Sequence, residues 1–256
     1  MDDAQPEAAS GGSPMPELKS RAGFLRYVAG LVGVYGPLGT LRLVLYELVY
    51  GVRFGFETLG MVSGDALAID RNLQAHARPY LPTPFYFACH AFRHLPADVS
   101  DSAFVEMGCG LGRVMLYASE FPFRKLVGIE VSEPLAAAAR RNLERFYRKW
   151  RRRSPPWQVV CCDAAAFDVP VESTVFYFAD PFDDTVMAPV IDNIVATVVN
   201  ARRRAFVIYV HPAHPEVLTD RGFRLVASEI DMNNRGFSIF TQGGEDDATA
   251  NLERNR

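Results

Sequence analysis

The sequence is poor in cysteine, and the few it has follow no recognisable spacing. Its four cysteines form no CxxC pair, so they predict neither a disulfide framework nor a zinc site. We therefore expect reduced thiols, no bound metal and a cytoplasmic location. The four are Cys89, Cys109, Cys161 and Cys162.

The sequence also lacks a long unbroken apolar stretch. The longest uncharged run lies between Arg26 and Arg42, and it contains Pro37 and four glycines. A spanning helix needs about 20 apolar residues with few breakers, so we expect no membrane span. The acidic N-terminus has no basic region followed by an apolar one, which excludes a secretory signal.

The chain as a whole has no large excess of positive or negative charge, but one segment is strongly basic. The 27 Lys and Arg against 30 Asp and Glu give a net charge of −3, so the protein is no polycation. Residues 140–153 hold eight basic residues and one acid, Glu144. A solvated helix face, helped by cations near the C-terminus of the helix, is favoured over nucleic-acid binding.

The segment after Pro37 predicts an amphipathic helix that Gly51 would end. Its apolar residues recur at offsets of 3 and 4 and share one helical face. We expect this face to pack on its own domain or on a second copy, which would give a homodimer. A membrane-surface anchor is the alternative. The face consists of Leu41, Val44, Leu45, Leu48 and Val49.

From residue 103 onward, short apolar runs alternate with helical stretches. With 256 residues, 49% of them apolar, the chain has material for one large α/β domain and an appendage. Continuously apolar strands predict a doubly wound, mostly parallel sheet of seven strands, closed by an antiparallel C-terminal hairpin. The strands are expected at 103–107, 126–130, 158–161, 173–179, 205–210, 223–230 and 236–241, and the domains at 1–19 (disordered tail), 20–79 (helical extension), 80–242 (ligand-binding domain) and 243–256 (disordered tail).

The most informative segment is the glycine-rich turn after the first of these strands. Glu106 precedes three glycines, Gly108, Gly110 and Gly112, in the pattern E-x-G-x-G-x-G. Such a turn between a strand and a helix lets a ligand approach the backbone closely.

Acidic residues follow the next two strands. Glu130 ends its strand 18 residues after Gly112, where a carboxylate can bind both hydroxyls of a ribose. Asp163 follows the third strand and could accept a hydrogen bond from an adenine amino group, although it could equally be a helix cap. Together these residues predict a nucleoside site at the carboxyl edge of the sheet.

Two features separate S-adenosylmethionine (SAM) from a dinucleotide. Pyrophosphate binding favours G-x-G-x-x-G, but Arg113 stands where the third glycine would be. Glu106 would repel a pyrophosphate, whereas it suits the ammonium group of SAM.

With these motifs, residues 80–241 resemble the class I SAM-dependent methyltransferases. The resemblance is carried by FVEMGCGLGRV, VGIEVSEPLAAAARRNLERF, CCDAAAF and FYFADPF. It implies that the three glycines cradle SAM and that Glu106 orients its amino group. Glu130 would then bind the ribose, while Asp163 and Ala164 contact the adenine. Tyr80 and Thr83, just upstream of the first strand, are further expected contacts, although a proline-stiffened linker is the alternative for this segment.

The methyl acceptor is only partly indicated. The fourth strand ends in Ala179-Asp-Pro-Phe182, one proline short of the N/D-P-P-Y/F motif of amino-group methyltransferases. Asp180 would accept an N–H hydrogen bond and Phe182 would pack on the acceptor, unless this is simply a turn. His211, after the fifth strand, could be a base for an oxygen acceptor.

We therefore expect a SAM-dependent methyltransferase that acts on a small molecule or a protein side chain, with an amine slightly favoured. A nicotinamide-dependent oxidoreductase and a non-catalytic SAM-binding protein are the alternatives. The helical extension, residues 20–60, is expected to close over the acceptor pocket and set its selectivity.

Overall fold

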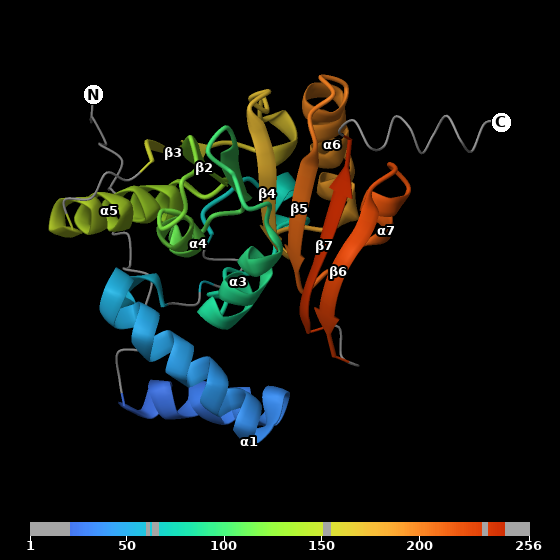
Figure 1. Cartoon of the computed structure of the whole chain (residues 1–256). Coiled ribbons are helices and arrows are strands. Elements are labelled where there is room, and N and C mark those ends of the chain that lie inside the picture. The colour runs from blue at the N-terminus through green and yellow to red at the C-terminus, as the bar shows by residue number, and fades with distance from the viewer. Residues whose placement is uncertain (1–20, 60–61, 63–66, 151–154, 232–234, 244–256) are drawn as a thin grey trace, which may run out of the picture.

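A computed structural model describes residues 21–59, 62, 67–150, 155–231 and 235–243. They form a seven-stranded sheet with helices on both faces and a long N-terminal helix at one end of the sheet (Figure 1). The expected tails, 1–19 and 243–256, lie outside the described residues except for Gly243.

The sheet has the order β3-β2-β1-β4-β5-β7-β6 and confirms the expected architecture. Neighbouring strands from β3 to β5 pair in parallel, and β7 is antiparallel to both β5 and β6. Each expected strand is present to within one residue at either end. The strands are β1 (Ala103–Met107), β2 (Lys125–Glu130), β3 (Trp157–Cys161), β4 (Ser173–Ala179), β5 (Ala205–Val210), β6 (Arg224–Ile230) and β7 (Gly236–Gln242).

The central strands are apolar throughout because both of their faces are covered. All five residues of β1 are buried. Phe104 packs into one core cluster with α3, α4 and α5, while its neighbour Val105 packs into a second cluster with α6 and α7. These helices are α3 (Phe85–Ala91), α4 (Arg113–Ala118), α5 (Glu133–Trp150), α6 (Asp184–Ile194) and α7 (Glu216–Thr219).

Shorter elements connect the core helices and strands. A π-helical turn, η5, extends α6, so that the two together cover the expected helix at 184–199. The π-helical η5 covers Val195–Val199, and the other short elements are single helical turns. They are η1 (Phe56–Thr58), α2 (Arg71–Gln74), η3 (Phe92–His94) and η4 (Ala164–Ala166).

The N-terminal helix α1 (Arg21–Phe54) corrects two expectations. It continues past Gly51 to Phe54, and its backbone breaks at Gly36 (φ 69°), directly before Pro37. The face expected to pack on the domain points outward, since Leu41 and Leu45 are 54% and 52% exposed. The helix is apolar on two sides, and the side rich in aromatic rings is the one that packs inward, because large rings bury the most apolar area.

Candidate functional site

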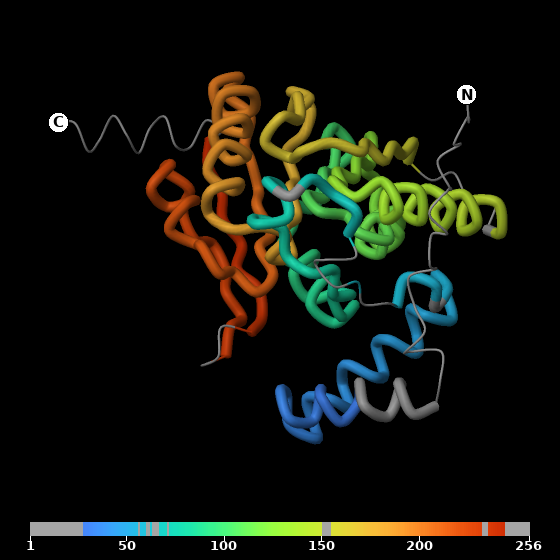
Figure 2. Tube along the Cα trace, turned by 180° about the vertical axis from the view of Figure 1, so that it is seen from behind, coloured from blue at the N-terminus to red at the C-terminus, as the bar shows by residue number. Residues whose placement is uncertain are grey.

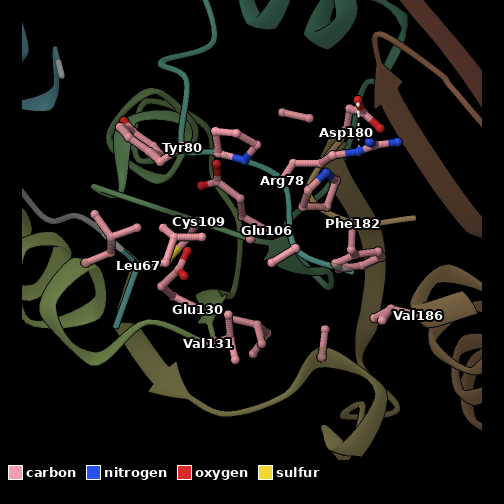
Figure 3. A pocket seen from close by; sticks show the side chains of 18 of the residues that line it. Leu67, Arg78, Tyr80, Glu106, Cys109, Glu130, Val131, Asp180, Phe182 and Val186 are labelled. Atoms are coloured by element: carbon pink, nitrogen blue, oxygen red, sulfur yellow. Dashed lines mark ion pairs between the residues drawn. The ribbon is translucent and has the colours of Figure 1, made fainter. Parts of the chain in front are cut away.

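A pocket lies at the carboxyl edge of the sheet, beside the ends of β1, β2 and β4 (Figure 3). This is the edge at which doubly wound sheets bind their ligands. One side of the pocket is lined by residues of the glycine loop and another by residues 77–81. Apolar side chains such as Val131 and Leu135 alternate in the wall with the carboxyl groups of Glu106, Glu130, Asp163 and Asp180.

The glycine loop, residues 108–112, requires glycine for its backbone and for its close contacts. Gly108, Gly110 and Gly112 all have positive φ, of 76°, 52° and 76°. A Cβ atom on Gly110 would lie 2.1 Å from Cε2 of Tyr80, and one on Gly108 would lie 2.5 Å from Cβ of Pro181. The loop is therefore packed against both neighbouring walls of the pocket, and a side chain at either position would push a wall aside.

Four of the five backbone N–H groups of this loop donate hydrogen bonds within the protein. Gly108 and Cys109 both donate to the carbonyl oxygen of Ile129, at 2.9 and 2.8 Å. Gly112 donates to the carbonyl oxygen of Cys109 at 2.8 Å, and Gly110 donates to Oε2 of Glu130 at 2.8 Å. A phosphate-binding loop instead points its N–H groups at the ligand.

Glu106 occupies the N-terminal end of α4. Its Oε2 accepts a hydrogen bond from the backbone N–H of Met115 at 3.0 Å, and its side chain is buried, with the residue 4% exposed. Burial raises the pKa of Glu106 well above its usual range. A carboxyl group therefore already fills the place where a helix N-terminus would hold a phosphate.

Glu130 is held in a fixed orientation at the end of β2. Its two oxygens accept separate hydrogen bonds, from Gly110 N–H at 2.8 Å and from Ser132 N–H at 3.0 Å. Burial raises the pKa of Glu130 as well. A carboxylate has about four lone-pair sites, so each oxygen keeps one for a further donor. Two adjacent hydroxyl groups could be bound in this way.

The position of Asp163 is compatible with both roles considered for it, a helix cap and a ligand contact. Its Oδ1 accepts from Ala165 N–H at 2.9 Å and so caps η4. The half-buried side chain also lines the pocket, next to Ala164 and Cys162. The cap uses one oxygen, which leaves the other for a ligand.

A segment that we call the strap, residues 73–83, closes the pocket on the side facing β4. Arg78 N–H donates to the carbonyl oxygen of Pro181 at 3.1 Å, and Asp183 N–H donates to the carbonyl oxygen of His76 at 3.1 Å. The side chains of His76 and Asp183 also meet, at 2.7 Å. The strap is thus a paired wall, and it places Tyr80 and Thr83, both expected ligand contacts, in the pocket lining.

Asp180 is the most strained residue of the pocket. Its φ of +46° is unusual for a residue other than glycine, and such strain concentrates at functional sites. Among the described residues its buried Oδ1 has no hydrogen-bond partner, while Oδ2 lies 3.8 Å from Nε of Arg78 (Figure 3). Burial raises the pKa of Asp180. Phe182 lies beside it in the same wall.

His211 lies outside the set of residues that line this pocket. Its ring packs edge-to-face on Phe87, and its Nδ1 accepts a hydrogen bond from Gly236 N–H at 3.3 Å. Burial lowers the pKa of His211. These contacts support a structural role for the histidine, and its role as a base stays a prediction.

Arg113 is a pocket residue that the sequence reasoning treated only as a missing glycine. It is 3% exposed and forms a buried ion pair with Glu47 of α1. It also donates to the carbonyl oxygen of Thr83 at 2.8 Å and to Oγ1 of Thr58 at 2.9 Å, and its guanidinium lies 3.8 Å from the ring centroid of Phe85. A charged residue in a glycine position was the available signal, since a buried charge must find a partner.

The expectation that residues 20–60 close over the pocket stays a prediction. Among the described residues before β1, those that line the pocket begin at Leu67 and include Leu73 and residues 77–81 of the strap. Helix α1 contacts Arg113, the residue after the glycine loop, through the ion pair with Glu47.

The basic segment lies mostly on the exposed side of α5, as expected. Arg141, Arg148 and Lys149 are exposed, while Arg145 pairs with Glu57. Arg140 is only partly exposed and binds Glu133 and the carbonyl oxygen of Val159. Residues 151–153 lie outside the described residues.

No family model and no curated protein matches the chain. Similar solved structures include a SAM-dependent methyltransferase from Aquifex aeolicus (11% identity, 60% of this chain and 86% of that chain, TM-score 0.44). A putative RNA methyltransferase from Pyrococcus horikoshii has 15% identity over 63% of this chain and 85% of its own, with a TM-score of 0.46. Magnesium protoporphyrin IX methyltransferase from Synechocystis, with bound SAM, has 13% identity over 63% and 77%, with a TM-score of 0.44.

These similarities are too distant to transfer a function to this chain. The sequence predicted a doubly wound, mostly parallel sheet of seven strands with an antiparallel C-terminal hairpin, and the structure confirms it.

Proposed function

We propose that this protein is a SAM-dependent methyltransferase. The observation that carries the proposal is Glu106, a buried carboxyl group at the N-terminus of α4 and in the wall of the pocket. A pocket built around this group complements a cationic ligand. SAM brings an ammonium group and a sulfonium centre, and its methyl group is the one that is transferred.

The remaining pocket residues fit the rest of such a ligand. Glu130, with one lone pair free on each fixed oxygen, would bind the two ribose hydroxyls. Asp163 would accept from the adenine amino group through the oxygen that is not used in capping η4. Val131 and Ala164 provide apolar lining in the same pocket as the carboxylate of Asp163.

The same observations disfavour a nicotinamide-dependent oxidoreductase. Such an enzyme binds a pyrophosphate at the glycine loop, through free N–H groups and a helix N-terminus. Here Gly108, Gly110 and Gly112 donate internally, and the carboxyl group of Glu106 already occupies the helix end. A pyrophosphate would have to displace the hydrogen bonds and bury its charge against a carboxyl group.

An amine acceptor is the proposal best supported by Asp180. Its buried, unpartnered Oδ1 could accept an N–H hydrogen bond and so direct the nitrogen lone pair toward the methyl group. In the in-line displacement, nitrogen forms the new bond to the methyl carbon. The sulfur retains the electron pair of the broken bond, and the ammonium product loses a proton to solvent. A small molecule or a protein side chain could supply the amine, and Phe182 would pack against it.

The location of the protein remains a prediction. Its cysteines are all free, which supports a reducing compartment such as the cytoplasm.

Calorimetric titration with SAM, its demethylated product and NADH tests the cofactor. We expect heat from the first two and none from NADH, whereas binding of NADH alone would overturn the proposal. Incubation with methyl-labelled SAM and size-fractionated cell extract then tests catalysis. We expect labelling of one fraction by the wild type and much less by Asp180→Ala, which removes the hydrogen-bond acceptor. Binding of SAM without any labelled fraction would favour the non-catalytic alternative.

A further inference from the structure

The side of α1 that faces away from the sheet is apolar and exposed. We call this side, after the break at Gly36, the outer face of α1; its side chains are between 50% and 71% exposed. Val32 and Val34, before the break, add to it at 40% and 43%. An apolar surface of this extent marks an interaction site. The outer face consists of Leu38, Leu41, Leu45, Leu48, Val49 and Val52.

The protein holds this face outward through firm contacts on the opposite side of the helix. Tyr50 and Phe54 pack on the ring of Phe85, with centroid distances of 5.1 and 5.5 Å. Between them and the break, Glu47 forms its buried ion pair with Arg113 and accepts from the backbone N–H of Phe85 at 2.9 Å. Rotating the helix to bury its leucines would break this ion pair, so the exposure is built into the fold.

The helix is apolar enough to enter a lipid environment. Within Val28–Phe54 an 18-residue window has a mean hydropathy of 1.5 and is 11% buried, which makes the helix a candidate span by length and composition despite the contrary expectation. The break at Gly36 and Pro37 divides it into two arms that meet at an angle (Figure 2). A bent helix with an arginine on its lipid-facing side, Arg42, fits the surface of a bilayer better than its interior.

The charges of α1 have one sign on the outside. Its sequence contains four arginines and one acid, a net charge of +3, and that acid is Glu47, which is buried. Arg42 and Arg53 are exposed, and Arg53 also pairs with Glu120. A leucine-rich face bordered by arginines complements anionic lipid, because the apolar side chains enter the acyl region while the arginines bind the headgroups.

We propose that the outer face of α1 attaches the protein to the surface of an anionic membrane. A second copy of the chain fits less well. The steps of three and four from Leu38 to Val52 match a coiled-coil seam, but they cover only about two heptads. The flanking positions are Arg42, Val44 and Val49, so a partner helix would offer no opposite charge for the arginine. This proposal is independent of the proposed methyl transfer.

Flotation with lipid vesicles tests the attachment. The full chain is mixed with vesicles of phosphatidylcholine alone, or of phosphatidylcholine with phosphatidylserine, and the floating fraction is measured at low and high salt. We expect flotation with the anionic vesicles and less with the neutral ones or at high salt. Leu45→Glu combined with Leu48→Glu should reduce the partition coefficient about tenfold or more.

Leu225→Glu is the matched control, because Leu225 on β6 is similarly exposed, at 56%, and is not part of the outer face of α1. It should float like the wild type, and thermal unfolding of all variants should coincide. Absence of flotation, or unchanged flotation of the double variant, would overturn the proposal. So would a dimer in analytical ultracentrifugation that the double variant converts to monomer without any vesicle binding, because the outer face would then bind a second copy.

Discussion

The pocket and the outer face of α1 depart from the usual distribution of side chains in opposite directions. The pocket buries carboxyl groups, with Glu106 and Glu130 4% and 6% exposed, whereas the outer face leaves Leu38 and Val52 64% and 71% exposed. Each arrangement costs free energy in the isolated chain. A complementary partner would offset this cost in each region. That partner is a cation in the pocket and an apolar phase outside α1.

Arg113 joins the two regions. It donates to the carbonyl oxygen of Thr83, in the strap, and pairs with Glu47 of α1, so that one buried side chain positions both a pocket wall and the helix. The buried contacts that keep the apolar face of α1 exposed therefore lie close to the ligand site. The following predictions test how far the two regions depend on such buried charges.

The largest effect is expected from breaking this connection. Arg113→Met leaves the carboxylate of Glu47 buried without a cation, so the free energy of unfolding should fall by about 3–5 kcal/mol in urea titrations. Arg124→Met, on an exposed arginine, should change it by less than about 0.5 kcal/mol.

The double variant Glu47→Gln/Arg113→Met should recover most of the loss. Glutamine can still accept the hydrogen bond from Phe85 N–H, and no charge remains buried. A loss below about 1 kcal/mol in Arg113→Met alone would show that the ion pair does not hold α1 in place.

The second effect concerns the ribose. Glu130→Ala should weaken SAM binding about a hundredfold in calorimetry, because two hydrogen bonds to a charged group contribute about 1.5 kcal/mol each. Glu133→Ala, three residues later and exposed, is the control and should bind as the wild type does. Equal affinities of Glu130→Ala and the wild type would remove the carboxylate from the ligand site.

The third effect concerns the charge of Glu106. Burial raises its pKa, so between the ordinary glutamate pKa and the raised one the folded protein holds a proton that the unfolded chain has lost. The free energy of unfolding of the ligand-free protein should therefore fall as the pH rises from the ordinary glutamate pKa through the raised one. Glu106→Gln should reduce this slope, leaving the part due to Glu130, whose pKa is also raised.

The same variant should weaken SAM binding about tenfold near neutral pH, since an ionised carboxylate is lost opposite the ammonium group. In the wild type the affinity should rise with pH over the same interval. Stronger SAM binding by Glu106→Gln than by the wild type would contradict the proposed ammonium contact.

The sheet could be predicted from the sequence because its determinants are local. Strands such as β1 and β4 are short apolar runs bounded by turn signals, and their buried faces leave little choice of register. The glycine loop and Glu130 were predictable for a related reason. Each follows directly after a strand, and parallel strands bring such positions to one edge.

The remaining features depend on contacts between distant segments. The strap pairs with residues 181–183, about a hundred positions away, through backbone hydrogen bonds that leave no pattern in the sequence. Which face of α1 packs on the domain could not be predicted because both of its faces are apolar, and only the tertiary pairing of Glu47 with Arg113 decides which one packs inward. His211 and Asp180 both follow a strand, yet only Asp180 lines the pocket.

The smallest effect separates the two roles of Asp163. Asparagine can keep the cap of η4 through its Oδ1, but its amide nitrogen would replace the oxygen that faces the ligand. Asp163→Asn should therefore leave the unfolding free energy unchanged and weaken SAM binding about fivefold, whereas Asp163→Ala should lower both, with about 1 kcal/mol lost in unfolding. If asparagine binds SAM as tightly as aspartate, the residue is a cap alone. Of the three carboxyl groups proposed to bind SAM, only Glu106 and Glu130 would then remain.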